Sequence, residues 1–282
     1  MSVKILIDSA SDITKEEASK LGIEMIPMEI LFGEDTYLDG INLLPQEFYE
    51  KLIESDVLPK TSQVTPYRFE EAYSKLINEG YEVVVITISS KLSNTYNSAV
   101  LASNQYQGKV FVVDSLNAAV GERILYGYAL RLIDKGLDAS AIKKELDNIK
   151  TKINIIAVVD TLEYLKKGGR VSKATAFAGE LFSIKPVLSV IDGEVKMIGK
   201  ARGSKKANNL LNELVTKKGG IDFSLPFGAL YSGLSDVYVK KYIKDSAYLW
   251  EKETDIVPCY ILGSTIGTHV GPGAIGVAFF EK

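Results

Sequence analysis

Two largely apolar, β-branched runs, at residues 83–88 and 109–113, constrain the fold of this chain more than any other feature. A strand with one face in water alternates apolar and polar residues, whereas a parallel strand covered on both faces is apolar throughout. Predicted helices at 66–78 and 95–105 precede and separate these runs, and Thr65 stands as N-cap before the first of them. This alternation predicts an N-terminal, doubly wound α/β domain with a mostly parallel sheet.

The second half of the chain has a different pattern. Asp192-Gly193 separates two strand-like runs, which predicts a tight β-hairpin. Further helices and strands follow, so we expect a C-terminal α+β domain with a mixed sheet. We place the domains at residues 1–163 and 164–282. The remaining predicted elements are strands 3–7, 23–31, 153–159, 187–191, 195–200, 227–231, 256–262 and 274–280, and helices 14–21, 45–55, 116–135, 139–150, 204–217 and 236–250.

Charge and composition exclude several classes of function. The chain has 36 acidic and 33 basic residues and a formal net charge of -3, so it lacks the basic field that attracts nucleic acid. It has one cysteine, Cys259, and one histidine, His269, which excludes zinc sites built from Cys and His. No apolar stretch approaches the roughly 20 residues that span a bilayer, and the N-terminus lacks a signal-peptide core. We therefore expect a cytoplasmic protein without a metal or other cofactor.

Hydroxyl-rich segments follow three of the predicted strands. They are residues 8–12, 89–95 and 114–115, and a fourth group, Thr61-Ser62-Gln63, precedes the capped helix. Because ligands bind beyond the carboxyl ends of parallel strands, we expect these segments to lie near one binding site. Their hydroxyls and the free N–H groups of the helix that begins near Thr95 suit a carboxylate or a phosphate. Ordinary caps and turns use the same residue types and are the alternative interpretation.

The second half supplies cations and the histidine. Arg170 follows two lysines and two glycines, Arg202 stands where a strand meets a helix, and His269 lies in the segment 267–273, which we expect to be a loop. Either arginine alone is typical of a solvated surface charge. The glycines around His269 allow close approach to a ligand and favour a binding site. An enzyme acting on a small phosphorylated or hydroxylated metabolite, with His269 or an aspartate as base, is an alternative interpretation.

Seven short segments stand in order along the whole chain: residues 8–12, 61–63, 90–99, 114–115, 162–170, 184–188 and 269–273. None is decisive alone, but as a set they resemble the DegV family of bacterial fatty-acid-binding proteins. The resemblance implies a two-domain protein that holds a long-chain fatty acid, such as palmitate, stearate or oleate, in a buried tunnel. Two positions depart from the family pattern, because Asn94 replaces a usual glycine and Val64 a frequent proline. These departures concern the geometry of the carboxylate site.

The resemblance also implies which residues bind the ligand. Burying a methylene is worth about 0.8 kcal/mol, so a tail of about fifteen would gain on the order of 10 kcal/mol before ordering costs. The carboxylate needs hydrogen-bond donors, since a desolvated one without them would cost several kcal/mol. Thr61 and Ser93 would hold it, and the other implied ligand-binding residues are Ser62, Thr95 and His269.

The resemblance further implies partners. In the fatty-acid-kinase branch of the family a separate kinase subunit phosphorylates the acyl carboxylate, and an acyltransferase uses the acyl phosphate. The binding protein presents the ligand and is not itself an enzyme. Arg170 and Arg202 match positions tied to that presentation. Transient contact with a membrane surface is compatible with this role.

Overall fold

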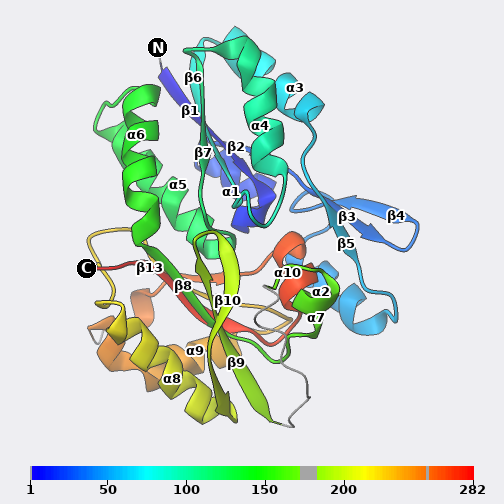
Figure 1. Ribbon diagram of the computed structural model, residues 1–282, viewed down its shortest axis with the longest axis vertical. Helices are drawn as coiled ribbons and strands as arrows, with labels where there is room; N and C mark the ends of the chain where they lie inside the picture. Colours follow the sequence, from blue (N-terminus) through cyan, green and yellow to red (C-terminus); the bar gives the residue numbers. More distant parts are fainter. Residues whose placement is uncertain (1, 172–182, 252–253) are drawn as a thin grey trace.

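The computed structural model describes residues 2–171, 183–251 and 254–282. The strands within these ranges form sheets of four, six and three strands. In Figure 1 the four-stranded sheet occupies the upper half of the molecule, the six-stranded sheet the lower half, and the three-stranded sheet stands at the right. The predicted combination of a mostly parallel sheet with a separate mixed sheet is confirmed.

The four-stranded sheet is parallel and has the order β2-β1-β6-β7. Its central strands are apolar and buried because helices cover both faces: α3 and α4 lie on one side, α5 and α6 on the other (Figure 1). These elements are β1 Ser2–Asp8, β2 Glu24–Ile26, β6 Tyr81–Thr87, β7 Val110–Asp114, α1 Lys15–Lys20, α3 Pro66–Asn78, α4 Thr95–Ser103, α5 Ala119–Asp134 and α6 Ala139–Ile149.

Helix α3 begins where the sequence predicts it. The Thr65 hydroxyl accepts a hydrogen bond from the N–H of Arg68, and Pro66 occupies the first turn. Three side chains of its apolar stripe, Phe69, Tyr73 and Leu76, are buried against the sheet and against α4. Local capping and the spacing of apolar residues therefore account for this helix.

The six-stranded sheet is mixed, with the order β10-β9-β8-β13-β11-β12. The predicted hairpin joins β9 to β10, and both Asp192 and Gly193 have positive φ, 54° and 82°, as a two-residue hairpin turn requires. Helices α8 and α9 pack with Phe279 and Trp250 in a second core. The elements are β8 Ile153–Val158, β9 Ile184–Ile191, β10 Glu194–Arg202, β11 Gly228–Tyr231, β12 Cys259–Ile261, β13 Ile275–Phe280, α8 Ser204–Lys217, α9 Val237–Asp245, η5 Ala247–Trp250 and η6 Thr254–Ile256.

The three-stranded sheet corrects one prediction. Residues 23–31 do not form one strand, because β2 ends at Ile26 in the parallel sheet and β3 begins at Glu29 in the antiparallel one. Pro27 lies in the break, and a proline has no N–H with which to continue a ladder. The small sheet and the short helices beside it are β3 Glu29–Phe32, β4 Asp35–Leu38, β5 Lys60–Ser62, α2 Pro45–Glu54, α7 Glu163–Lys167 and α10 Ser264–Val270.

The chain changes sheet before residue 163. Strand β8 pairs with β9 and β13 in the middle of the six-stranded sheet, although it was predicted to close the first domain. Its apolar sequence does not specify which sheet it joins, because its pairing partners lie more than 25 residues further along the chain. The domain limits 1–163 and 164–282 stay a prediction.

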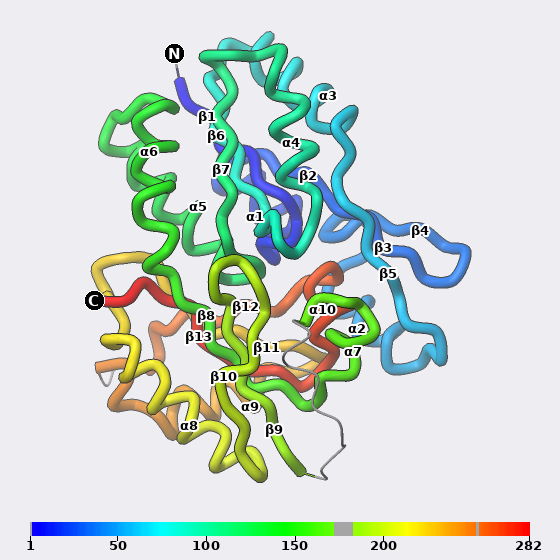
Figure 2. Tube along the Cα trace, viewed as in Figure 1, coloured from blue at the N-terminus to red at the C-terminus, as the bar shows by residue number. Residues whose placement is uncertain are grey.

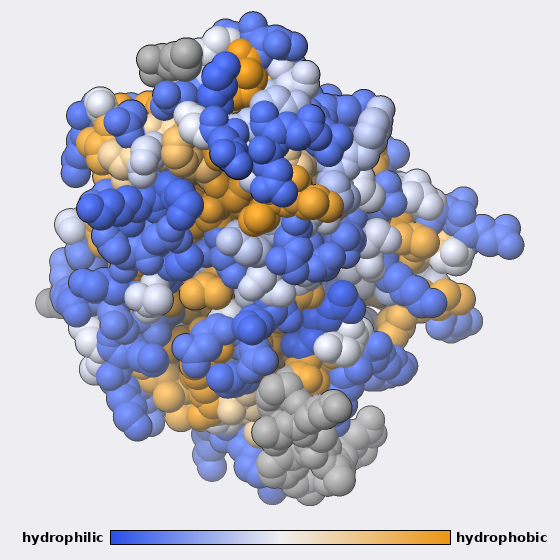
Figure 3. All heavy atoms as spheres, turned by 45° about the horizontal axis from the view of Figure 1, so that its top comes forward, coloured by the Kyte–Doolittle hydropathy of each residue, from blue (hydrophilic) through white to orange (hydrophobic). Residues whose placement is uncertain are grey.

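The surface carries both hydrophobic and hydrophilic residues. On the face shown in Figure 3, hydrophobic residues form separate patches among hydrophilic ones. Among the described residues no helix has both the length and the apolar character needed to cross a bilayer.

The core of the six-stranded sheet provides a test of the fold. Phe279, in β13, is fully buried, so Phe279→Ala should lower the free energy of unfolding by about 3–5 kcal/mol. Tyr238 on α9 is 74% exposed, so Tyr238→Ala should change that free energy by no more than about 0.5 kcal/mol. Urea unfolding followed by circular dichroism measures both variants. Equal effects of the two substitutions would contradict the placement of β13.

Candidate ligand-binding site

A cavity of about 410 Å³ lies between the two larger sheets. Its volume is in the range typical of small-molecule sites, about 300–1,000 Å³. The walls come from both halves of the protein: the segments after β6 and before α5 on one side, β8 and β9 on the other. Most lining side chains are apolar: Met28, Ile88, Leu92, Ala118, Ala119, Ile155, Ala157, Val159, Leu165, Leu188, Val190, Val195, Leu230, Leu262, Ile266, Val270 and Ala274.

Polar residues also line the cavity. Thr61 is held in β5, where it pairs with Ile30 of β3. Its Oγ1 lies 2.9 Å from Nε2 of His269, although the two residues are 208 positions apart. The polar lining residues are Thr61, Ser62, Gln63, Ser93, Asn94, Arg170, Ser189, Thr265 and His269.

A hydrogen bond to Thr95 joins the two hydroxyl segments. The Thr95 Oγ1 accepts from the N–H of Val64, at 3.2 Å, and lies 2.9 Å from the Oγ of Ser93. Thr95 itself is fully buried and is not one of the residues that line the cavity. This contact brings the segment after β5 to the start of α4, so that Thr61 and Ser93 reach the same cavity.

The two arginines have different places. Arg170 lines the cavity and donates from Nε to the carbonyl of Leu92 at 3.3 Å and from Nη1 to that of Gly168 at 2.6 Å. Arg202 is exposed at the far end of β10, where it pairs with Ile184, and it is not a lining residue. The structure therefore brings Arg170 to the other predicted site residues and leaves Arg202 apart from them.

His269 lies in a helix and not in the predicted loop. It belongs to the last turn of α10. Burial, with a smaller contribution from the charge of Arg170, lowers the pKa of His269 to about 4, so its imidazole is neutral at neutral pH. Its Nδ1 is buried without a hydrogen-bond partner among the described residues. A Cβ added at Gly168 would lie 2.2 Å from that nitrogen, so glycine is required for this close approach.

Helix α10 is held by two carboxylates, of which sequence reasoning named Asp12, within the segment 8–12, and missed Asp39. Asp39 accepts from the N–H groups of Ser264 and Thr265, at 3.0 and 3.2 Å, and Asp12 accepts from that of Gly263 at 2.7 Å. Thr265, also missed, lines the cavity. It follows an apolar strand, as the hydroxyl segments of the first half do, and that rule could have identified it.

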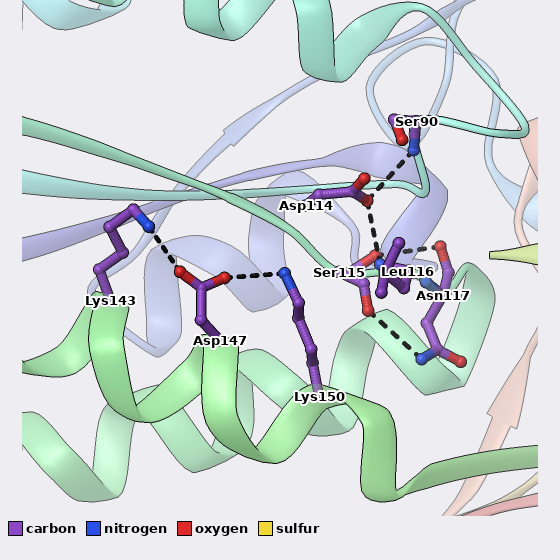
Figure 4. Close-up of polar contacts among 8 residues, drawn as sticks. All are labelled: Ser90, Asp114, Ser115, Leu116, Asn117, Lys143, Asp147 and Lys150. Carbon is purple, nitrogen blue, oxygen red and sulfur yellow. Dashed lines mark hydrogen bonds and ion pairs between the residues drawn. The ribbon is translucent and has the colours of Figure 1, made fainter. Parts of the chain in front are cut away.

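Two of the hydroxyl-rich segments serve the backbone and not the cavity. Asp114 accepts from the N–H groups of Ser90 and Leu116, and the Ser115 hydroxyl bonds with the backbone of Asn117 (Figure 4). Asp8 likewise accepts from the N–H groups of Ala10 and Ile88. Asp114 and Ser115 therefore form a local turn, as the alternative interpretation has it. Asp8 and Asp12 instead accept from backbone N–H groups that are distant in sequence, at Ile88 and Gly263.

Comparison with known proteins agrees with this architecture. The DegV family model matches residues 2–282. A DegV domain-containing protein of Clostridium perfringens is 34% identical over 99% of both chains. A protein of Thermotoga maritima named fatty acid-binding protein is 35% identical, over 98% of this chain and 96% of that one.

Solved structures show the same fold over the full length. The crystal structure of a DegV lipid binding protein from Thermotoga maritima matches with a TM-score of 0.86 and 32% identity, covering 100% of both chains. A structure described as fatty acid binding of a DegV family protein from Thermus thermophilus matches with a TM-score of 0.87 and 31% identity, again over 100% of both. Sequence and fold therefore agree, and the chain belongs to the DegV family.

Proposed function

We propose that this protein binds one long-chain fatty acid in the cavity and presents its carboxylate for phosphorylation by a separate fatty acid kinase. One observation carries the proposal: Thr61 and Ser93, from distant segments, line one predominantly apolar cavity. Relatives support the ligand class, since a structure from Eubacterium ventriosum, 26% identical with a TM-score of 0.86, is described as a stearic acid-binding protein. The apolar lining gives less support to an enzyme for small polar metabolites.

The apolar wall suits an acyl tail. Each methylene moved out of water contributes about 0.8 kcal/mol, so a tail of about fifteen gains on the order of 10 kcal/mol before the cost of ordering it. The apolar part of the lining consists of Met28 and of branched aliphatic and alanine side chains, from the segments after β6 and before α5 and from the C-terminal half. The tail would supply most of the affinity, and the headgroup would fix its direction.

The polar wall suits a carboxylate. With a neutral imidazole whose Nε2 carries the proton, His269 donates to the oxygen of Thr61. The Thr61 proton is then free to point into the cavity and to donate to a carboxylate. Ser93 supplies a second hydroxyl, and Ser62, next to Thr61 in β5, also lines the cavity. The positive charge of Arg170 favours an anion.

The exposure of one polar lining residue fits the presentation of the ligand's carboxylate to a kinase subunit. Asn94 lines the cavity and is exposed at the surface. A carboxylate held beside it would be accessible to the kinase subunit, and an acyltransferase would then use the acyl phosphate. Arg202, exposed on β10, remains a candidate for contact with the kinase. Because Arg202 is not among the lining residues, a docking role suits it better than a ligand-binding one.

Ligand extraction tests the proposal directly. Native mass spectrometry of freshly purified protein should show one bound molecule per chain, and organic extraction should release a fatty acid of 14–18 carbons. A chain that carries no lipid after repeated preparations, and takes up none of an added fatty acid, would exclude this function.

The hydroxyl groups can be tested separately. Thr61→Val and Ser93→Ala should each raise the Kd for palmitate by about 10-fold to 100-fold, the loss expected for a hydrogen bond to a charged group. Thr216→Val is the matched control, because its hydroxyl bonds to the carbonyl of Asn212 on α8, outside the cavity. Isothermal titration measures the three variants. If Thr61→Val behaves like Thr216→Val, Thr61 does not hold the carboxylate.

The state of His269 can be read from NMR, since the chain has one histidine. Its imidazole should stay neutral from pH 8 to pH 5 and titrate at about pH 4. The unfolded chain binds its proton near pH 6.5, so this residue lowers the free energy of unfolding as pH falls from 6.5 to 4, by up to about 3 kcal/mol. His269→Gln should lose that part of the pH dependence. A titration near pH 6.5 would show that the imidazole is not buried as described.

A further inference from the structure

The loop that carries Ser93 is organised by one buried residue. The carbonyl of Ser89 accepts from the N–H groups of Leu92 and Ser93, at 2.9 and 3.1 Å. The Ser89 Oγ accepts from the N–H of Lys91 at 3.2 Å, and the residue is fully buried. The position of Ser93 therefore depends on where Ser89 lies.

The second sheet reaches this loop through its hairpin. The hydroxyl of Ser89 donates to the carbonyl of Gly193, 104 positions later, at 2.8 Å. Figures 1 and 2 show the β9–β10 hairpin extending from its sheet toward the segment that follows β6. We call this hydrogen bond the tip contact.

Gly193 is suited to the tip contact in two ways. Its φ is +82°, in the left-handed region that favours glycine. An added Cβ would also lie 2.4 Å from the Ser89 Oγ and 3.2 Å from Cγ of Lys91. A side chain here would push the hairpin and the Ser93 loop apart.

The same hairpin forms part of the apolar wall. Leu188 and Val190 of β9 and Val195 of β10 line the cavity. A second tie, from Arg170 to the carbonyl of Leu92, holds the other side of the Ser93 loop. Two contacts from the C-terminal half therefore hold the Ser93 loop, the tip contact and the hydrogen bond from Arg170. The tip contact comes from the hairpin whose strands also line the cavity where the acyl tail would lie.

From this geometry we infer that Ser89 and Gly193 are positioning residues: the tip contact sets the place of the Ser93 hydroxyl relative to the carboxylate. The inference rests on the proposed function, because it assigns a role within fatty acid binding. A positioning role predicts a loss that depends on the carboxylate. A ligand with the same tail and no carboxylate should bind almost as before.

The test compares two glycines with similar backbones. Gly136 has φ +80° and no atom within 4 Å of an added Cβ, so Gly136→Ala carries the same backbone strain as Gly193→Ala without the collision. Both variants should lose stability through the backbone strain, and Gly193→Ala should lose more because of the collision. Kd values for tetradecanoate and for 1-tetradecanol are measured on both variants and on the wild type by displacement of a fluorescent fatty acid.

Gly193→Ala should raise the Kd for tetradecanoate by about tenfold and that for tetradecanol by less than about twofold, since one charge-assisted hydrogen bond is misplaced. Gly136→Ala should leave both values unchanged. Ser89→Ala removes the tip contact without adding atoms, so it should also raise the Kd for tetradecanoate more than that for tetradecanol. This variant replaces Gly193→Ala in the test if Gly193→Ala does not fold.

Two results would overturn the inference while leaving the proposed function intact. One is a Kd for tetradecanoate in Gly193→Ala and Ser89→Ala equal to that of Gly136→Ala. The other is an equal rise in the Kd values for tetradecanoate and for tetradecanol, which would mean that the hairpin affects only the binding of the tail. A wild type that does not bind tetradecanoate would overturn the proposed function, and this inference with it.

Discussion

The structure depends on two buried carboxylates that hold the start of helix α10. Asp12 and Asp39, both from the N-terminal half, accept hydrogen bonds from three successive backbone N–H groups at residues 263–265. Burial raises the pKa of both carboxyls, and the N–H groups oppose that rise. Since a buried carboxylate without donors costs several kcal/mol, these contacts fix one arrangement of the two halves. That arrangement places His269 beside Thr61.

The cavity follows from how the halves meet. The halves share a hydrophobic core, in which α5 packs against β8, β11 and β13 of the six-stranded sheet. Polar contacts join them near the cavity, namely the start of α10, the Arg170 contact to Leu92 and the tip contact. Packing beside α10 is close, since a Cβ on Gly267 would lie 2.5 Å from the ring of Phe48 on α2. The shared core and these polar contacts hold the halves together and leave a cavity between them.

The sequence predicted those elements whose formation depends on interactions between neighbouring residues. The capped helix α3 and the Asp192-Gly193 hairpin are examples, because each is specified by adjacent residues. The pairing of β8 and the helical state of α10 were missed, since each depends on distant partners. Glycines flank α10 at both ends, and a carboxylate 225 positions away holds it. In the site, the resemblance pointed to Thr61, Ser93, Arg170 and His269, all of which line the cavity, but their binding roles remain predictions.

A crystal structure of the protein with palmitate tests the central claim most directly. We expect both carboxylate oxygens within hydrogen-bonding distance, about 2.5–3.0 Å, of the hydroxyl oxygens of Thr61 and Ser93, with the tail lying between the two larger sheets. A carboxylate bound away from those two hydroxyls, or a tail lying outside the cavity, would contradict the account.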